Sequence, residues 1–196
     1  EQWNESRRTE TLDLLRENVY GHRPTTDYTL TFEQTAEMKG AFDGLATGRS
    51  VTVKIIIGER SFSWPMTVFV PNEATKPVPA IVLINSRYFT PLEKAATEPD
   101  PFWSVEEILK RGYATACFHT SDVDPDQKDG YADGIRSFFA NGAEPEPDAW
   151  RSLSAWGWAA SRALDYFESL DEVDATRAAV VGHSRGGKTS LWAAAE

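Results

Sequence analysis

The chain has 196 residues, of which 41% are hydrophobic, enough for the core of one domain of ordinary size. Its formal net charge of −10 at pH 7 argues against binding to nucleic acid or to an anionic membrane surface. No apolar run approaches the roughly 20 residues of a membrane span, so we expect a soluble protein. The single cysteine, Cys117, is expected to be a buried, inert thiol, and it does not decide the cellular compartment.

The first part of the chain predicts one helix and then strands that each bury one face. Residues 5–19 have an amphipathic pattern with Leu12, Leu15 and Val19 on one side, which predicts a helix. The segments that alternate apolar and polar side chains, and so predict strands, are 28–37, 50–57 and 61–70. Residues 58–60 predict a hairpin turn between the last two of these strands.

The pattern changes after residue 80, where continuous apolar runs typical of fully covered strands alternate with helical segments. The elements expected in this part are strands at 80–84, 113–118 and 177–181 and helices at 104–111, 148–170 (with Asp148 as N-cap) and 188–196. Strands alternating with helices imply a parallel sheet with right-handed crossovers. We therefore expect an α/β fold in which antiparallel strands lead into a parallel sheet flanked by helices.

A serine lies at the sharp turn between the last strand and the last helix. The run Gly182-His183-Ser184-Arg185-Gly186 fits the G-x-S-x-G nucleophile elbow of α/β-hydrolases. Glycines without a Cβ atom allow the strand and the helix to approach closely around such a turn. Ser184 is therefore the candidate nucleophile, and the position of this elbow after the third parallel strand favours the α/β-hydrolase fold.

An elbow of this kind needs two donors for an oxyanion. The backbone N–H of Arg185, directly after the nucleophile, is the first candidate. The second is expected in the loop after the first parallel strand, and we nominate the backbone around Ser86 and Arg87.

Two further side chains lie close to Ser184 in the sequence. Lys188 is one helical turn beyond it, so it either reaches a polar substrate or remains a solvated surface lysine. His183 is adjacent to Ser184, but neighbours on a sharp turn point in different directions, so we expect a structural role for it. His119, at the end of a predicted strand, is expected to be a hydrogen-bonded structural histidine.

Several aspartates follow the strand predicted at 113–118, and the sequence indicates neither a metal site nor a cofactor. The cluster consists of Asp122, Asp124, Asp126, Asp129 and Asp133. Because Gln127 stands where a calcium loop requires glycine, a solvated loop rich in turns is expected instead.

The acid and the base of a hydrolase triad follow the serine in this fold, in the order Ser, Asp or Glu, His. Only twelve residues follow Ser184 here, and none is a histidine. We therefore expect an incomplete domain over residues 1–196, truncated after the elbow helix. A missing C-terminal segment or a second chain would complete its sheet.

The run from Gly182 to Lys188 resembles the G-C-S-R-x-G-K elbow of glucuronoyl esterases and of their bacterial relatives, which are often called acetyl xylan esterase-like. The other segments similar to this family are 19–24, 122–126, 156–158 and 161–165. The resemblance implies that Ser184 attacks an ester carbonyl and that Arg185 stabilises the oxyanion with its side chain as well as its N–H. It also implies that Lys188 contacts sugar hydroxyls. His183 replaces the cysteine of the fungal members.

These observations predict a serine esterase that acts on a carbohydrate or uronate ester through an acyl-enzyme on Ser184. A prolyl-oligopeptidase-like peptidase and a broad deacetylase are the alternatives among enzymes. A catalytically silent carbohydrate-binding or scaffold fragment is the alternative from another class. The expected substrate is a small-molecule or carbohydrate ester.

Overall fold

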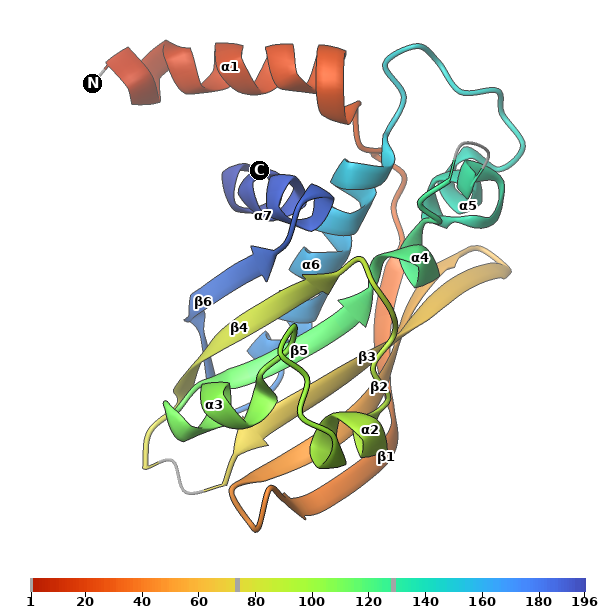
Figure 1. The fold of residues 1–196 in the computed structure, drawn as a ribbon. Helices are drawn as coiled ribbons and strands as arrows, with labels where there is room; N and C mark the ends of the chain where they lie inside the picture. Colours follow the sequence, from red (N-terminus) through yellow and green to blue (C-terminus); the bar gives the residue numbers. More distant parts are fainter. Residues whose placement is uncertain (1, 73–74, 128–129) are drawn as a thin grey trace.

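Six strands form one mixed sheet with the order β1-β2-β3-β5-β4-β6 (Figure 1). The sheet is seen in a computed structural model that describes residues 2–72, 75–127 and 130–196. The strands are β1 (Thr29–Ala41), β2 (Ala46–Ile57), β3 (Arg60–Pro71), β4 (Val78–Asn85), β5 (Ala114–His119) and β6 (Val173–Gly182). The order confirms the expected antiparallel start followed by a parallel part.

The antiparallel part comes from the three alternating segments. β1 pairs with β2 and β2 with β3, both antiparallel, and Gly58 has the positive φ of 59° that the predicted hairpin turn requires. On β2 the apolar positions Val51, Val53 and Ile55 are at most 1% exposed, while the residues between them are partly exposed. The period of two thus sets which face of this ribbon is buried.

The parallel part brings the ends of three strands to one edge of the sheet. β4 lies between β5 and β6 and pairs in parallel with both. At its carboxyl end Asn85 is opposite His119, and Ile84 is opposite Gly182. The segments that leave these strands therefore lie together, which is where α/β proteins build their sites.

Helices cover both faces of the sheet (Figure 1). One face carries α2 (Leu92–Thr97) and α3 (Val105–Lys110) over a smaller core that contains Phe69, Trp103 and Cys117. The other carries α6 (Ser152–Glu168) and α7 (Arg185–Ala195) over the larger core. All the tryptophans except Trp3 are at most 5% exposed, so they pack the interior.

Two local predictions about the helices were wrong, and one helix was missed. The long helix begins at Ser152 and not at 148, since the backbone of Asp148 is engaged by His22, whose N–H donates to the Asp148 carbonyl at 2.9 Å. The N-terminal helical segment extends to Tyr20, but Val19 is 43% exposed. Tyr20 makes the contact with α7 instead, because its ring stacks on Trp192 with 4.1 Å between ring centres. α2 was not predicted. The N-terminal segment consists of η1 (Trp3–Arg7), α1 (Arg8–Leu15) and η2 (Arg16–Tyr20).

The loop between β5 and α6 also contains more structure than expected. It carries three short helical elements, α4 (Thr120–Val123), η3 (Gly130–Asp133) and α5 (Ile135–Ala140). Within the described residues, no helix combines the length and the apolar character needed to cross a membrane.

Candidate active site

Ser184 occupies a strained turn between β6 and α7. Its φ of 56° and ψ of −116° lie in a region of backbone conformation that residues other than glycine rarely adopt. This conformation costs on the order of 1–3 kcal/mol. Ser184 is exposed, and its carbonyl accepts the first helical bond, from the Lys188 N–H at 3.1 Å. The backbone strain therefore presents the hydroxyl at the carboxyl edge of the sheet, directly before a helix N-terminus.

The glycines around Ser184 let this strand and this helix meet. A Cβ atom on Gly182 would lie 2.4 Å from the backbone carbon and oxygen of Gly186. A Cβ atom on Gly186 would lie 3.0 Å from the Ile84 carbonyl oxygen at the end of β4. The expected close approach is confirmed, and it also places the start of α7 against the end of β4.

The oxyanion candidates lie on these two segments. Arg185 is the first residue of α7, where a backbone N–H has no partner within the helix. The Arg87 N–H already donates to the buried side chain of Asn85, Oδ1, at 2.9 Å. Of the two amides nominated in this loop, Ser86 is therefore the one that stays a candidate, with Arg87 engaged in holding the turn.

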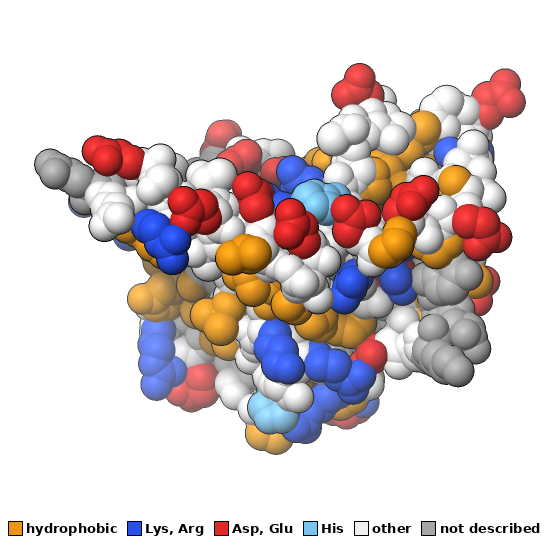
Figure 2. Space-filling view, turned by 90° about the horizontal axis from the view of Figure 1, so that it is seen from above, with side chains coloured by type: hydrophobic (Ala, Val, Ile, Leu, Met, Phe, Trp, Pro, Cys, Tyr) orange, Lys and Arg blue, Asp and Glu red, His pale blue; other side chains and the backbone are white. Residues whose placement is uncertain are grey.

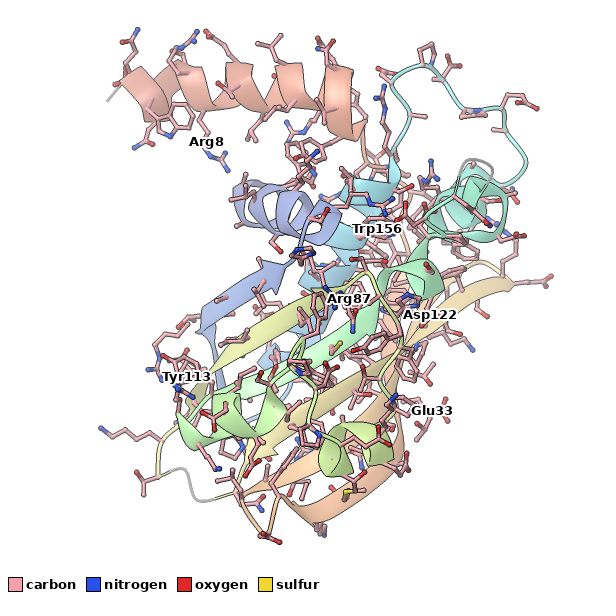
Figure 3. All side chains as sticks on the ribbon, viewed as in Figure 1. Arg8, Glu33, Arg87, Tyr113, Asp122 and Trp156 are labelled. Atoms are coloured by element: carbon pink, nitrogen blue, oxygen red, sulfur yellow. The ribbon has the colours of Figure 1, made fainter. Side chains whose placement is uncertain are left out.

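The side chain of Arg87 is exposed in the loop directly after β4. Figure 3 shows it at the carboxyl end of β4, on the edge that also carries Asp122 of α4. Its guanidinium carbon is 4.1 Å from the centre of the Phe102 ring. The His183 ring lies near the same Phe102 ring, at 6.2 Å between ring centres. His183 thus contacts an aromatic residue beside the nucleophile.

Lys188 is exposed on α7, one turn beyond Ser184. In the part of the chain that the structure describes, no carboxylate lies within ion-pair distance of its ammonium group. Lys188 therefore stays a candidate for contact with a ligand at the elbow.

The aspartates after β5 differ from the solvated loop that was expected. Asp124 is fully buried against Arg136, and Asp126 pairs with Arg185, while Asp129 lies outside the described residues. Sequence reasoning did not find these pairs, although the Asp-Pro-Asp spacing of the segment was visible in the resemblance.

The described histidines leave Ser184 without a hydrogen-bonded base. The Nδ1 atom of His119 lies 3.8 Å from the Asp122 carboxylate. Among residues 2–72, 75–127 and 130–196, no side chain forms a hydrogen bond with the Ser184 hydroxyl. The described residues thus hold the candidate nucleophile and the candidate oxyanion donors, without a base bonded to the serine.

We expect Cys117 to be chemically silent in the folded protein. It is 1% exposed on β5, and this burial raises the pKa of its thiol to about 12, so the reactive thiolate is scarce at pH 8. Alkylation with iodoacetamide at pH 8, followed by peptide mass spectrometry, should leave Cys117 unmodified in the native full-length protein. The same treatment in guanidinium chloride should modify it fully, and rapid native modification would contradict this description.

The strand order, the parallel edge and the strained serine together define an α/β-hydrolase. The chain belongs to the glucuronoyl esterase family, since residues 53–195 match the family described as "Glucuronyl esterase, fungi". These residues make up well over half of the chain and include the whole elbow.

Solved structures and a curated relative agree with this assignment. A glucuronoyl esterase from Solibacter usitatus is 31% identical, with a TM-score of 0.84 over 97% of this chain and 55% of its own. A glucuronoyl esterase from Teredinibacter turnerae is 28% identical, with a TM-score of 0.81 over 96% of this chain and 48% of its own. The carbohydrate esterase MZ0003, from an unknown prokaryotic organism, is 28% identical over 99% of this chain and 51% of its own length. The chain thus spans about half the length of these relatives.

Proposed function

We propose that this chain carries the nucleophile of a serine esterase that cleaves esters of a carbohydrate or of a uronic acid. The observation that carries the proposal is the backbone of Ser184, which is strained at φ 56° and directly precedes α7. Backbone strain of this kind gathers at functional sites, which favours a catalytic task for Ser184. Membership of the glucuronoyl esterase family supports the same chemistry.

The reaction would proceed in two steps. The Ser184 hydroxyl oxygen attacks the ester carbonyl carbon as its proton passes to a base, and the carbonyl oxygen becomes an oxyanion facing the Arg185 N–H. The carbon–oxygen bond to the alcohol then breaks, and the alcohol leaves with the proton. Water attacks the acyl-Ser184 ester in the second step and releases the acid. We place the base and its acidic partner in the remainder of the full-length protein, as the family resemblance implies.

The charges around the elbow support a carboxylic ester as the substrate. Arg87, Arg185 and Lys188 are all exposed here, in a chain whose net charge is −10. Figure 2 looks down on this edge and shows Lys and Arg side chains gathered around one histidine, with a band of hydrophobic side chains between them and a row of Asp and Glu side chains. Local positive charge favours the developing oxyanion and attracts a carboxylate product.

The names of similar proteins point to the same class of substrate. A fungal relative of 22% identity, from Sporotrichum thermophile, was solved as a serine-to-alanine mutant in complex with methyl 4-O-methyl-beta-D-glucopyranuronate. Hydrolysis assays with the full-length protein should use a methyl glucuronate ester, an aryl acetate and a prolyl peptide in parallel. Preference for the uronate ester is the expected result. Preference for the acetate or the peptide would favour a deacetylase or a peptidase, and inactivity on all three would refute the esterase proposal.

The outer edge of β6 has the features of a sheet edge that a further segment covers. Among the described strands β6 pairs only with β4, and the nearby Val181 and Leu191 side chains are 47% and 76% exposed. A groove of about 530 Å³ runs between β6, α6 and α7 and is lined mostly by apolar residues. Because an uncovered apolar sheet edge invites pairing, we propose that a strand from the remainder of the full-length protein lies here.

Lys188 should contribute to recognition of the sugar. In the full-length protein, Lys188→Ala should lower kcat/KM for a methyl glucuronate ester by about 10-fold, the loss expected for one charged hydrogen bond. Its effect on an aryl acetate should be under about 3-fold, because that substrate offers no sugar hydroxyls. Steady-state kinetics on both substrates make the comparison.

Lys110→Ala is the matched control, since Lys110 is an exposed lysine at the end of α3. It should change neither rate. Equal effects of Lys188→Ala on the two esters would show that Lys188 is an ordinary surface lysine.

A further inference from the structure

The segment after α4 is anchored in the protein interior by Asp124. The side chain of Asp124 is fully buried, and its Oδ2 atom accepts a hydrogen bond from Arg136 Nε at 2.8 Å. Its backbone carbonyl accepts another from the Trp156 indole, also at 2.8 Å. Burial raises the pKa of this carboxyl group although Arg136 opposes the rise. Three elements, α4, α5 and α6, thus hold this point of the chain.

The packing around Asp124 leaves little room for movement. A Cβ atom on Gly134, at the start of α5, would lie 2.2 Å from the Asp124 Oδ1 atom. A fixed Asp124 also limits where Asp126, two residues further along, can lie.

Asp126 faces the elbow and not the interior. Its carboxylate lies 2.6 Å from Arg185 Nη1, and this pair joins residues 59 positions apart. The Arg185 side chain is 59% exposed, so without this contact its long, flexible stem would sample many rotamers. Among the described residues only its Nη1 donates a hydrogen bond, which leaves the other guanidinium donors available.

We propose that Asp126 is a positioning residue that holds the Arg185 guanidinium beside Ser184, with Asp124 as its anchor. The inference rests on the proposed function, because it gives Arg185 a task at the oxyanion. Exposed ion pairs contribute little to the stability of a fold, so stability alone accounts poorly for a contact that links two distant segments at the elbow. A guanidinium held in place loses less freedom when the oxyanion forms, which lowers the barrier to reaction.

The first test measures the motion of Arg185 and does not depend on activity. In full-length protein labelled with ¹⁵N-arginine, the Arg185 Nε–H signal, assigned by its loss in Arg185→Lys, should show restricted motion. Asp126→Ala should release it, with a clear fall in the heteronuclear NOE. An Arg185 signal that is equally restricted in Asp126→Ala would overturn the proposal.

The second test asks whether Asp126 acts through Arg185. Asp126→Ala should lower kcat on the preferred ester about 10-fold, with KM changed less than about 2-fold. In an Arg185→Ala background the same substitution should have no further effect, whereas an equal fall there would overturn the positioning role. Asp126→Ala without any effect on an active protein would overturn it as well.

Asp174→Ala is the matched control, because the Asp174–Arg177 pair has the same 2.6 Å length and similar exposure at the far end of β6. It should leave kcat unchanged, and an equal fall there would overturn the specific role of Asp126. A wild-type protein that hydrolyses no ester would refute the proposed function, and the catalytic part of this inference with it. That outcome is seen before any variant is made, so the two failures are distinguishable.

Discussion

Ser184→Ala in the full-length protein will lower kcat on its preferred ester by about 10⁴-fold or more, because the substitution removes the only atom that forms the acyl-enzyme. The fold should survive, since Ser184 is exposed and its side chain has no hydrogen bond among the described residues. KM should change little, since the oxyanion donors and Lys188 remain in place. Steady-state kinetics and a denaturation curve of the same preparation measure both effects.

Ser169→Ala provides the control. The Ser169 hydroxyl bonds the Tyr166 carbonyl at 2.6 Å at the end of α6, far from the elbow in the fold, so its loss should leave kcat unchanged. Activity of Ser184→Ala within about 10-fold of the wild type would show that the nucleophile lies elsewhere.

Gly182→Ala will destabilise the protein by about 3 kcal/mol, the upper part of the range for overpacking a filled site. The new methyl group would lie 2.4 Å from backbone atoms of Gly186, which cannot turn aside as a flexible side chain can. β6 and α7 must therefore separate, which also removes the turn that presents Ser184. The midpoint of urea denaturation and ester hydrolysis should fall together.

Gly157→Ala tests whether the effect belongs to the elbow. Gly157 lies inside α6. A methyl group added there would lie 3.4 Å from the Ala193 Cβ atom, its nearest neighbour, which is an ordinary contact. Since alanine favours a helix by about 1 kcal/mol over glycine, this variant should be as stable as the wild type or more so. Unchanged stability of Gly182→Ala would contradict the described contact between strand and helix.

The fold was predictable because its signals are periodic and local. The alternation along β2 and the continuous apolar runs of β4 and β5 decide which faces are buried. The order of strands then follows from the change of pattern after residue 80. Errors occurred where a tertiary contact overrides a local preference, as at Asp148, a good N-cap residue whose backbone is engaged by His22.

The candidate site was predictable only as far as it lies within one stretch of sequence. The elbow and Lys188 share a single turn and helix, so their spacing reveals their proximity. Asp126 and Arg185 are 59 positions apart, and nothing local indicates that one would reach the other. The burial of Asp124 was missed for a related reason, because aspartates between turn residues ordinarily face solvent.

The engagement of the Arg87 amide shows the same limit. The loop after β4 was the expected place for an oxyanion donor, but the side chain of Asn85 turns back within it and accepts that N–H. Such an Asn-centred turn is common, although the sequence does not reveal which amide it takes.

Covalent labelling with a fluorophosphonate tests the central claim, that Ser184 is an activated nucleophile, most directly. The full-length protein should gain the mass of one phosphonyl group, and peptide mass spectrometry should place that group on Ser184. Ser184→Ala should remain unlabelled under the same conditions, and prior incubation with a methyl glucuronate ester should slow labelling of the wild type. A label on another serine, with Ser184 unmodified, would contradict the assignment of the active site.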